Sequence, residues 1–163
     1  MNTSQLKTYA PKARKAFIEA VSAQAARLGI TAKTIAPAEV RGDVLLLEGK
    51  ALPRAIAEPR RRLVERIQAQ GFGPTMEAVA YTWVNRFVAI RYMELHGYLG
   101  HGYRVLSHPE GLGRPEILDH ATDVDLPGLD PEKVVELKLD GTKDEELYRL
   151  LLKAQCNALH EAM

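Results

Sequence analysis

Two arginines and a glutamate lie within an otherwise apolar stretch, and their chemistry is tightly constrained. Residues 80–99 are apolar on nearly every side of the helix that their spacing predicts, yet they include Arg86, Arg91 and Glu94. A buried charge costs several kcal/mol, roughly, unless it is paired and hydrogen-bonded. Arg91 and Glu94 are three residues apart and share one helical face. We therefore expect a central helix with a buried, structural ion pair built from these three side chains.

A second group of charged residues could contact nucleic acid. Residues 1–70 hold 13 Lys and Arg against 6 Asp and Glu, whereas residues 71–163 hold 9 against 15. A basic surface binds DNA phosphates and adds salt-sensitive affinity without sequence specificity. The sequence leaves open the alternative that these are solvated helix faces, or that the two halves of opposite charge attract each other. The candidate contacts are Lys12, Arg14, Lys15, Arg60, Arg61, Arg62 and Arg66.

A short acidic motif invites a nuclease hypothesis. Glu136 and Lys138, preceded by aspartates within residues 123–125, are similar to the D…E-x-K element of metal-dependent nucleases. That element would require residues 135–139 to form a strand. Asp130 before a proline starts a helix and Gly141 ends one, so an ordinary short helix is favoured.

The histidines and the cysteine carry weaker signals. A His-Gly-Tyr unit occurs at residues 96–98 and again at 101–103, but the glycines are better explained as turn residues after a helix than as parts of a zinc site. Cys156 is the only cysteine, which excludes an internal disulfide and a C-x-x-C metal knuckle. We expect Cys156 to pack, and no metal to bind.

Helical periodicity dominates the rest of the chain. It predicts a mainly α fold, an irregular helical domain of four to five helices with at most a small β-hairpin. An irregular connector is expected over residues 98–129, which are rich in Gly, Pro, His and Asp. The predicted helices cover residues 11–28, 59–70, 74–96, 131–139 and 142 onward, and the predicted hairpin covers residues 43–52.

Composition is that of an ordinary globular protein. The 163 residues are 46% hydrophobic and 26% charged, enough apolar material for one compact domain over residues 1–163. No run reaches the roughly 18 to 20 apolar residues that span a bilayer, and the first segment lacks the apolar core of a signal peptide. We therefore expect a cytoplasmic protein that does not bind membranes.

A family resemblance adds to this interpretation. Residues 80–99 are similar to a pattern close to A-Y-T-W-x-N-R-x-x-A-I-R-Y-M-E-L-H-G-Y-L, and further matches lie at residues 7–14, 106–110, 144–149 and 155–160. Together these segments resemble the N-terminal region of the large adenine-specific DNA methyltransferases of BREX phage-defence systems, the PglX type. Members of that family are several times longer, and their methyltransferase core lies downstream of this segment.

The resemblance implies an enzyme whose chemistry lies elsewhere. The parent protein would methylate adenine at N6 with S-adenosylmethionine, but the present sequence has neither a glycine-rich cofactor loop after a strand nor the Asn-Pro-Pro-Tyr or Phe motif that holds a flipped adenine. We therefore expect no catalytic residue and no cofactor in this chain. It would be an N-terminal fragment that acts as a scaffold or contacts DNA backbone, with the rest of the methyltransferase chain, DNA and other defence proteins as expected partners.

Two alternatives remain at this stage. The chain could be a protein-interaction module that docks other defence components or a phage inhibitor. It could also be a small metal-dependent nuclease, which would need carboxylates that cluster in space.

Overall fold

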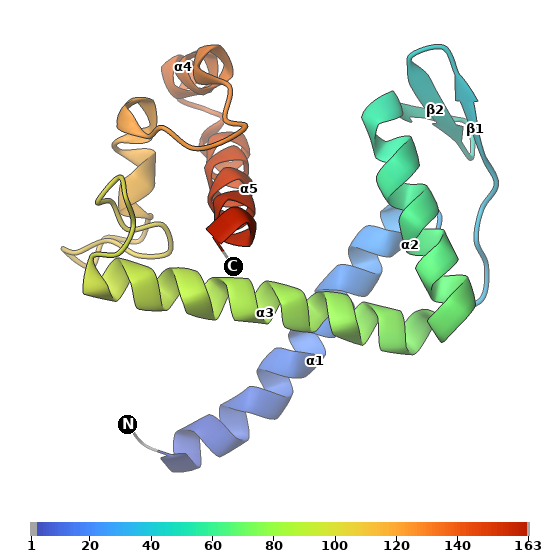
Figure 1. Ribbon diagram of the computed structural model, residues 1–163, viewed down its shortest axis with the longest axis horizontal. Coiled ribbons are helices and arrows are strands. Elements are labelled where there is room, and N and C mark those ends of the chain that lie inside the picture. The colour runs from blue at the N-terminus through green and yellow to red at the C-terminus, as the bar shows by residue number, and fades with distance from the viewer. Residues whose placement is uncertain (1–2, 163) are drawn as a thin grey trace. The chain divides into compact units, whose positions relative to one another are not determined.

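The computed structural model describes residues 3–162 and divides the chain into two compact units, residues 1–84 and 85–163. Five α-helices and a small antiparallel sheet make up most of these described residues (Figure 1). The predicted mainly α fold with four to five helices is thus confirmed. The expectation of a single domain over residues 1–163 stays a prediction.

The first unit contains helix α1 (Thr3–Arg27), helix α2 (Ala57–Gln70) and the first half of helix α3 (Phe72–His96). Its core is a cluster of buried apolar side chains, which the hydrophobic effect stabilises. The buried members come from α1, from the residues that follow it, and from α2 and α3: Ala25, Ile30, Ile67 and Met76.

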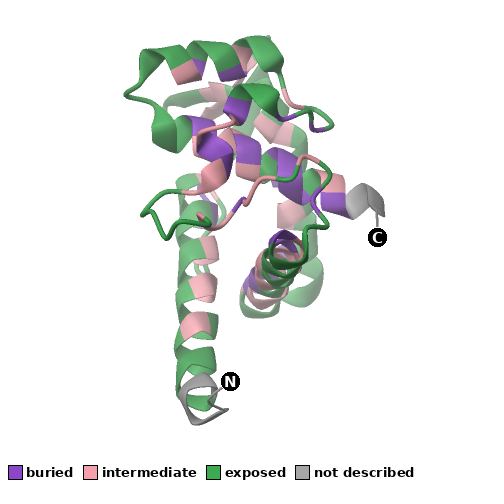
Figure 2. Ribbon diagram, turned by 90° about the vertical axis from the view of Figure 1, so that its left-hand side faces the viewer, coloured by how far each residue is buried: buried purple, intermediate pink, exposed green. Residues whose placement is uncertain are grey.

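Helix α1 begins earlier than the sequence predicts. We expected Pro11 in the first helical turn, but it lies inside the helix. A proline inside a helix removes one backbone donor and crowds the carbonyl four residues earlier, yet the residues before Pro11 are helical here. Along α1 the half-buried and buried residues recur on one side, while the rest of the surface is exposed (Figure 2). That is the pattern of a helix packed along one stripe.

The small sheet contains one strand more than the predicted hairpin. Strands β1 (Ala38–Arg41), β2 (Val44–Leu47) and β3 (Lys50–Pro53) pair in that order, both pairs antiparallel. Leu45 and Leu47 of the central strand are buried. β1 is short and exposed along its length, and its four residues are too few for their apolar–polar alternation to predict a strand.

The second unit begins within α3 and ends with helices α4 (Pro131–Asp140) and α5 (Asp144–Ala162). Between α3 and α4 the chain is irregular, as expected, and has only two 3₁₀ turns, at Glu116–Leu118 and Ala121–Asp123. Both turns contact the helices, the first α5 and the second α4. The fully buried side chains of this unit include Ile90, Val105, Ile117, Val134, Leu137, Leu147 and Leu151.

The ends of α4 follow the sequence signals. The Asp130 carboxylate accepts hydrogen bonds from the backbone N–H groups of Glu132 and Lys133, and Gly141 ends the helix with a left-handed conformation. α5 begins at Asp144, two residues after the expected cap Thr142. The Thr142 hydroxyl contacts the Asp140 carboxylate instead.

Helix α3 covers the predicted stretch and ends before Gly97, but it is not buried on all sides. The expectation of an enclosed helix was therefore wrong. Several large apolar residues along it are exposed, because hydrophobic composition alone does not determine which side finds a packing partner. No helix in the described part of the chain is both long and apolar enough to cross a membrane.

Candidate functional site

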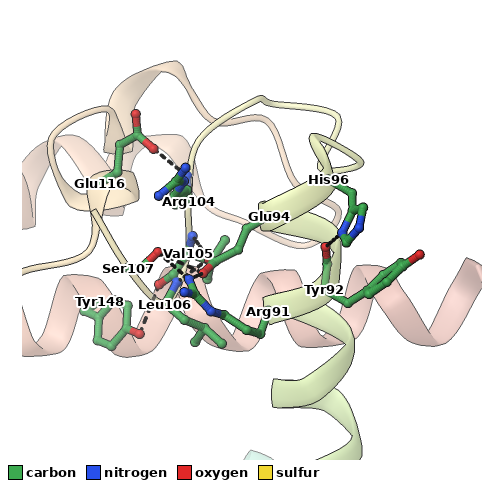
Figure 3. Close-up of polar contacts among 10 residues, drawn as sticks. All are labelled: Arg91, Tyr92, Glu94, His96, Arg104, Val105, Leu106, Ser107, Glu116 and Tyr148. Atoms are coloured by element: carbon green, nitrogen blue, oxygen red, sulfur yellow. Dashed lines mark hydrogen bonds and ion pairs between the residues drawn. The ribbon is translucent and has the colours of Figure 1, made fainter. Parts of the chain in front are cut away.

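The most elaborate polar arrangement in the second unit centres on Glu94. Its Oε2 atom accepts hydrogen bonds from the backbone N–H groups of Val105 and Leu106, both at 2.8 Å (Figure 3). Its Oε1 atom accepts from the Ser107 hydroxyl at 3.0 Å and from the guanidinium of Arg91. One carboxylate near the end of α3 thus holds three consecutive residues of the connector. We call this arrangement the Glu94 node.

Burial and hydrogen bonding act in opposite directions on this carboxyl. The side chain of Glu94 is fully buried, and that burial alone would raise its pKa. The hydrogen bonds from Leu106, Arg91, Ser107 and Val105 outweigh the desolvation and hold the pKa below its usual value. Glu94 is therefore ionised at neutral pH, and its charge is satisfied by fixed donors.

Two of the three residues expected in the ion pair contact each other, and one of these two is buried. Arg91 pairs with Glu94, yet the Arg91 side chain is 47% exposed. Its guanidinium also donates to the Ser107 hydroxyl at 2.7 Å, so it covers the node from the solvent side. Arg86 is half-buried and lies close enough to Cys156 to act on the pKa of that thiol.

The connector is held from α5 as well. The Tyr148 hydroxyl donates to the backbone carbonyl of Val105 at 3.1 Å (Figure 3). Burial raises the pKa of Tyr148, and the nearby Glu94 charge raises it further, so the phenol stays protonated and remains a donor. The Glu116 carboxylate accepts from the backbone N–H of Arg104 at 2.8 Å, which fixes the residue before this loop.

Arg60 does not fit the proposed nucleic-acid surface. The sequence groups it with its two neighbours, but its side chain is buried. Its guanidinium donates to the backbone carbonyl of Leu28 at 2.9 Å and to that of Ala36. Both acceptors lie in the segment between α1 and β1. Because this segment is outside the helix and the sheet, Arg60 takes the place of a backbone donor for these two carbonyls. Arg60 therefore ties α2 to the segment between α1 and β1, and its buried guanidinium is unsuited to contact a phosphate.

The other arginines of α2 are exposed but largely paired. Arg61 lies between Glu58 and Glu65, and Arg62 also contacts Glu58. Hydrogen bonds from Arg61 and Arg62 lower the pKa of Glu58 to about 2. Arg66 donates only to the Gln70 amide oxygen, at 3.4 Å, among the contacts seen. The helix therefore presents a mixed surface with a small cationic excess.

The α1 cations are exposed as well. Arg14 pairs with Glu77 of α3, and that hydrogen bond is the main cause that raises the pKa of Arg14. Lys15 lies 3.8 Å from Glu19, one turn further along the helix. Lys12 is exposed and makes no ion pair among the contacts of the described residues. Whether any of these side chains contacts DNA is untested and stays a prediction.

The nuclease interpretation finds no support. Glu136 and Lys138 lie on α4, so the strand that this interpretation requires is not formed. Lys138 donates to the backbone carbonyl of Leu118, while Glu136 pairs with Lys133. Among residues 7–159, whose side chains the structure describes, no three His, Cys, Asp or Glu side chains converge as a metal site would need.

The two His-Gly-Tyr units have different surroundings. His96 stacks on Tyr92 with ring centroids 4.1 Å apart, whereas a ring nitrogen of His101 lies 2.9 Å from the Gln155 amide oxygen. Tyr103 stacks almost parallel on His120 at 4.1 Å. The contacts of His101 and Tyr103 were missed in the sequence, because they join residues far apart in the chain, whereas His96 and Tyr92 are one helical turn apart.

Comparison with known proteins identifies the relatives of this chain. No family model matches it. The adenine-specific methyltransferase BrxX of Escherichia coli O9:H4 (strain HS) is 48% identical over 171 residues, which cover 100% of this chain and 14% of that protein. The adenine-specific methyltransferase PglX of Lacticaseibacillus casei (strain Zhang) is 34% identical over 184 residues, which cover 98% of this chain and 15% of that protein.

The predicted family is confirmed. This chain is related to the PglX-type adenine-specific methyltransferases and spans only 14% and 15% of the length of the two relatives. The segments that carry the PglX-type pattern meet at the Glu94 node. Arg91 and Glu94 come from the pattern of residues 80–99, Ser107 comes from that of residues 106–110, and Tyr148 from that of residues 144–149. The spacing of three residues links Arg91 with Glu94, and the resemblance was the signal that singled out the segments of Ser107 and Tyr148 as well.

Proposed function

We propose that this chain is the N-terminal helical scaffold of an adenine-specific DNA methyltransferase of a phage-defence system. The observation that supports this proposal is the Glu94 node, where both oxygens of one buried carboxylate accept hydrogen bonds that hold a loop, so the carboxylate is not available to a substrate. A satisfied buried polar network fixes one arrangement of the chain. In this proposal the larger enzyme is cytoplasmic, uses S-adenosylmethionine and methylates adenine at N6, while this segment holds no cofactor.

A chimera tests the scaffold function. In E. coli BrxX, this chain would replace the matching 14% of the enzyme, and adenine methylation of plasmid DNA would be measured. We expect the chimera to methylate. Glu94→Ala should lower the yield of folded chimera, while the enzyme that does fold keeps the KM for S-adenosylmethionine of the unsubstituted chimera. A raised KM for the cofactor would contradict a purely structural role.

Calorimetry on the isolated chain gives an independent test. The scaffold proposal predicts no heat of binding when S-adenosylmethionine is titrated into the 163-residue protein. Saturable binding of the cofactor would overturn the proposal that the chemistry lies elsewhere in the enzyme.

A second function, contact with DNA backbone, is favoured by the charge of the first unit. Residues 1–84 hold 13 Lys and Arg against 7 Asp and Glu. Lysine and arginine that neutralise phosphates release counterions, so affinity depends steeply on salt. Three of the exposed candidates are Lys12, Arg62 and Arg66.

Duplex binding at several salt concentrations tests this second function. Changing Lys12, Arg62 and Arg66 to glutamine should flatten the slope of log affinity against log salt by up to roughly three units, equally for different sequences. A matched control changes three cations of the second unit, Lys143, Arg149 and Lys153, and should leave the slope unchanged. If the unsubstituted chain binds no duplex at low salt, a protein-interaction module replaces DNA contact as the second candidate.

A further inference from the structure

An exposed apolar surface lies on the second half of α3. Val88, Tyr92 and Leu95 are 63%, 55% and 52% exposed, and Tyr98, just after the helix, is 61% exposed. Tyr92 follows Val88 by four residues, and Leu95 follows Tyr92 by three. This spacing places the three side chains on one side of the helix. We call these four residues the outer face of α3.

The outer face lies on a different side of α3 from Glu94. Tyr92 and Glu94 are two residues apart, which is about 200° around a helix of 3.6 residues per turn. Figure 3 shows the side chains of Tyr92 and His96 directed away from the loop that Glu94 holds. The node therefore anchors this half of α3 on one side and leaves the other side open.

The aromatic side chains of this surface are ordered by one another. A ring nitrogen of His96 lies 2.8 Å from the Tyr92 backbone oxygen, and the His96 ring stacks on Tyr92 with 26° between the planes. His96 also stacks on Tyr98 at 5.7 Å and 29°. Preordered rings lose less conformational entropy when a partner covers them. Tyrosine is among the residues enriched at protein interfaces.

Charge decides between the possible occupants of the outer face. Residues 85–163 hold 14 Asp and Glu against 9 Lys and Arg. This excess of negative charge repels DNA phosphates. It would also make two copies of the same unit repel each other. Another protein surface, neutral or basic, fits better. The relative BrxX contains further protein that could supply such a surface, because 100% of this chain matches only 14% of it.

We propose that the outer face of α3 docks against the remaining part of the same methyltransferase chain. This inference rests on the proposed function, because only the larger enzyme supplies that occupant. The Glu94 node ties the second half of α3 to the connector of its own unit. Val88, Tyr92, Leu95 and Tyr98 then enter an apolar depression of the catalytic part, where their burial excludes water.

Cysteine alkylation tests this docking. Leu95→Cys would be made both in the isolated chain and in the BrxX chimera, and the rate of maleimide labelling at that peptide would be followed by mass spectrometry. The rate should fall at least about tenfold in the chimera. Leu139→Cys is the matched control, because Leu139 is 81% exposed on α4, away from α3 in sequence. Its labelling rate should be the same in both proteins.

Each other outcome has a definite meaning. Equal labelling of Leu95→Cys in the isolated chain and in a methylating chimera overturns the docking and leaves the scaffold function intact. A folded chimera that does not methylate overturns the proposed function, and the docking inference with it. Protection in the isolated chain that grows with its concentration assigns the face to a second copy, and protection by added duplex assigns it to DNA; either result overturns the inference.

Discussion

Glu94 and Tyr148 hold the same residue from two helices. Glu94 on α3 accepts the backbone N–H of Val105, and Tyr148 on α5 donates to the backbone carbonyl of Val105. Both polar groups of a fully buried loop residue are thereby satisfied by side chains instead of by a sheet or helix. An irregular connector can remain buried only when its backbone finds such partners.

We predict unequal effects for the two members of the ion pair. Glu94→Ala should lower the free energy of unfolding by about 3 kcal/mol or more, because it leaves the N–H groups of Val105 and Leu106 without an acceptor. Arg91→Ala should cost only about 1 kcal/mol, because Arg91 is half exposed and Glu94 keeps three other donors. Urea denaturation of both variants measures the difference. Equal losses would mean that the node depends on the ion pair and not on the loop contacts.

The same carboxylate should make stability depend on pH. The pKa of Glu94 is lowered in the folded protein, so its ionised form contributes stability that is fully present above the pKa of the unfolded chain. That contribution is lost as the pH falls through the lower folded pKa. The difference in unfolding free energy between the unsubstituted protein and Glu94→Gln should therefore shrink from neutral pH to roughly pH 3. A difference that stays constant over this range would contradict the assigned pKa direction.

The elements were more predictable from the sequence than their surroundings were. Asp130 and Gly141 bound α4 as their local chemistry requires, because a cap acts on neighbouring residues. Burial is a property of the whole fold. The apolar pattern of residues 80–99 predicted the helix, but it could not predict that Val88 and Leu95 would remain exposed.

The candidate site shows the same limit. The pairing of Arg91 with Glu94 follows from their spacing of three residues, whereas the contacts of Glu94 with residues 105–107 join positions more than ten residues apart. Arg60 was grouped with Arg61 and Arg62 because the three are consecutive. Consecutive helical residues point about 100° apart, so one of them faces the core while the others face solvent.

Tyr148→Phe should destabilise the protein modestly. The substitution keeps the ring and removes the hydroxyl that donates to the Val105 carbonyl, so we expect a loss of about 1 kcal/mol. Thermal unfolding and urea denaturation measure it. Leu139→Ala, at an exposed position of α4, is a control for an unspecific change and should have almost no effect. If Tyr148→Phe has no effect either, water replaces the hydroxyl and α5 does not hold the loop.

Arg60 and Arg62 provide the sharpest contrast on a single helix. Arg60→Gln should lower the free energy of unfolding by about 2 kcal/mol, because the shorter amide cannot reach both the Leu28 and Ala36 carbonyls. Arg62→Gln should leave stability unchanged, because the Arg62 side chain is 74% exposed and its pairing with Glu58 is screened by solvent. Salt titration of duplex binding should give the opposite result, since only Arg62 is accessible to phosphate. If Arg60→Gln kept its stability but flattened the salt slope, Arg60 would have to leave its buried position to meet DNA, and the structural role assigned to it would be wrong.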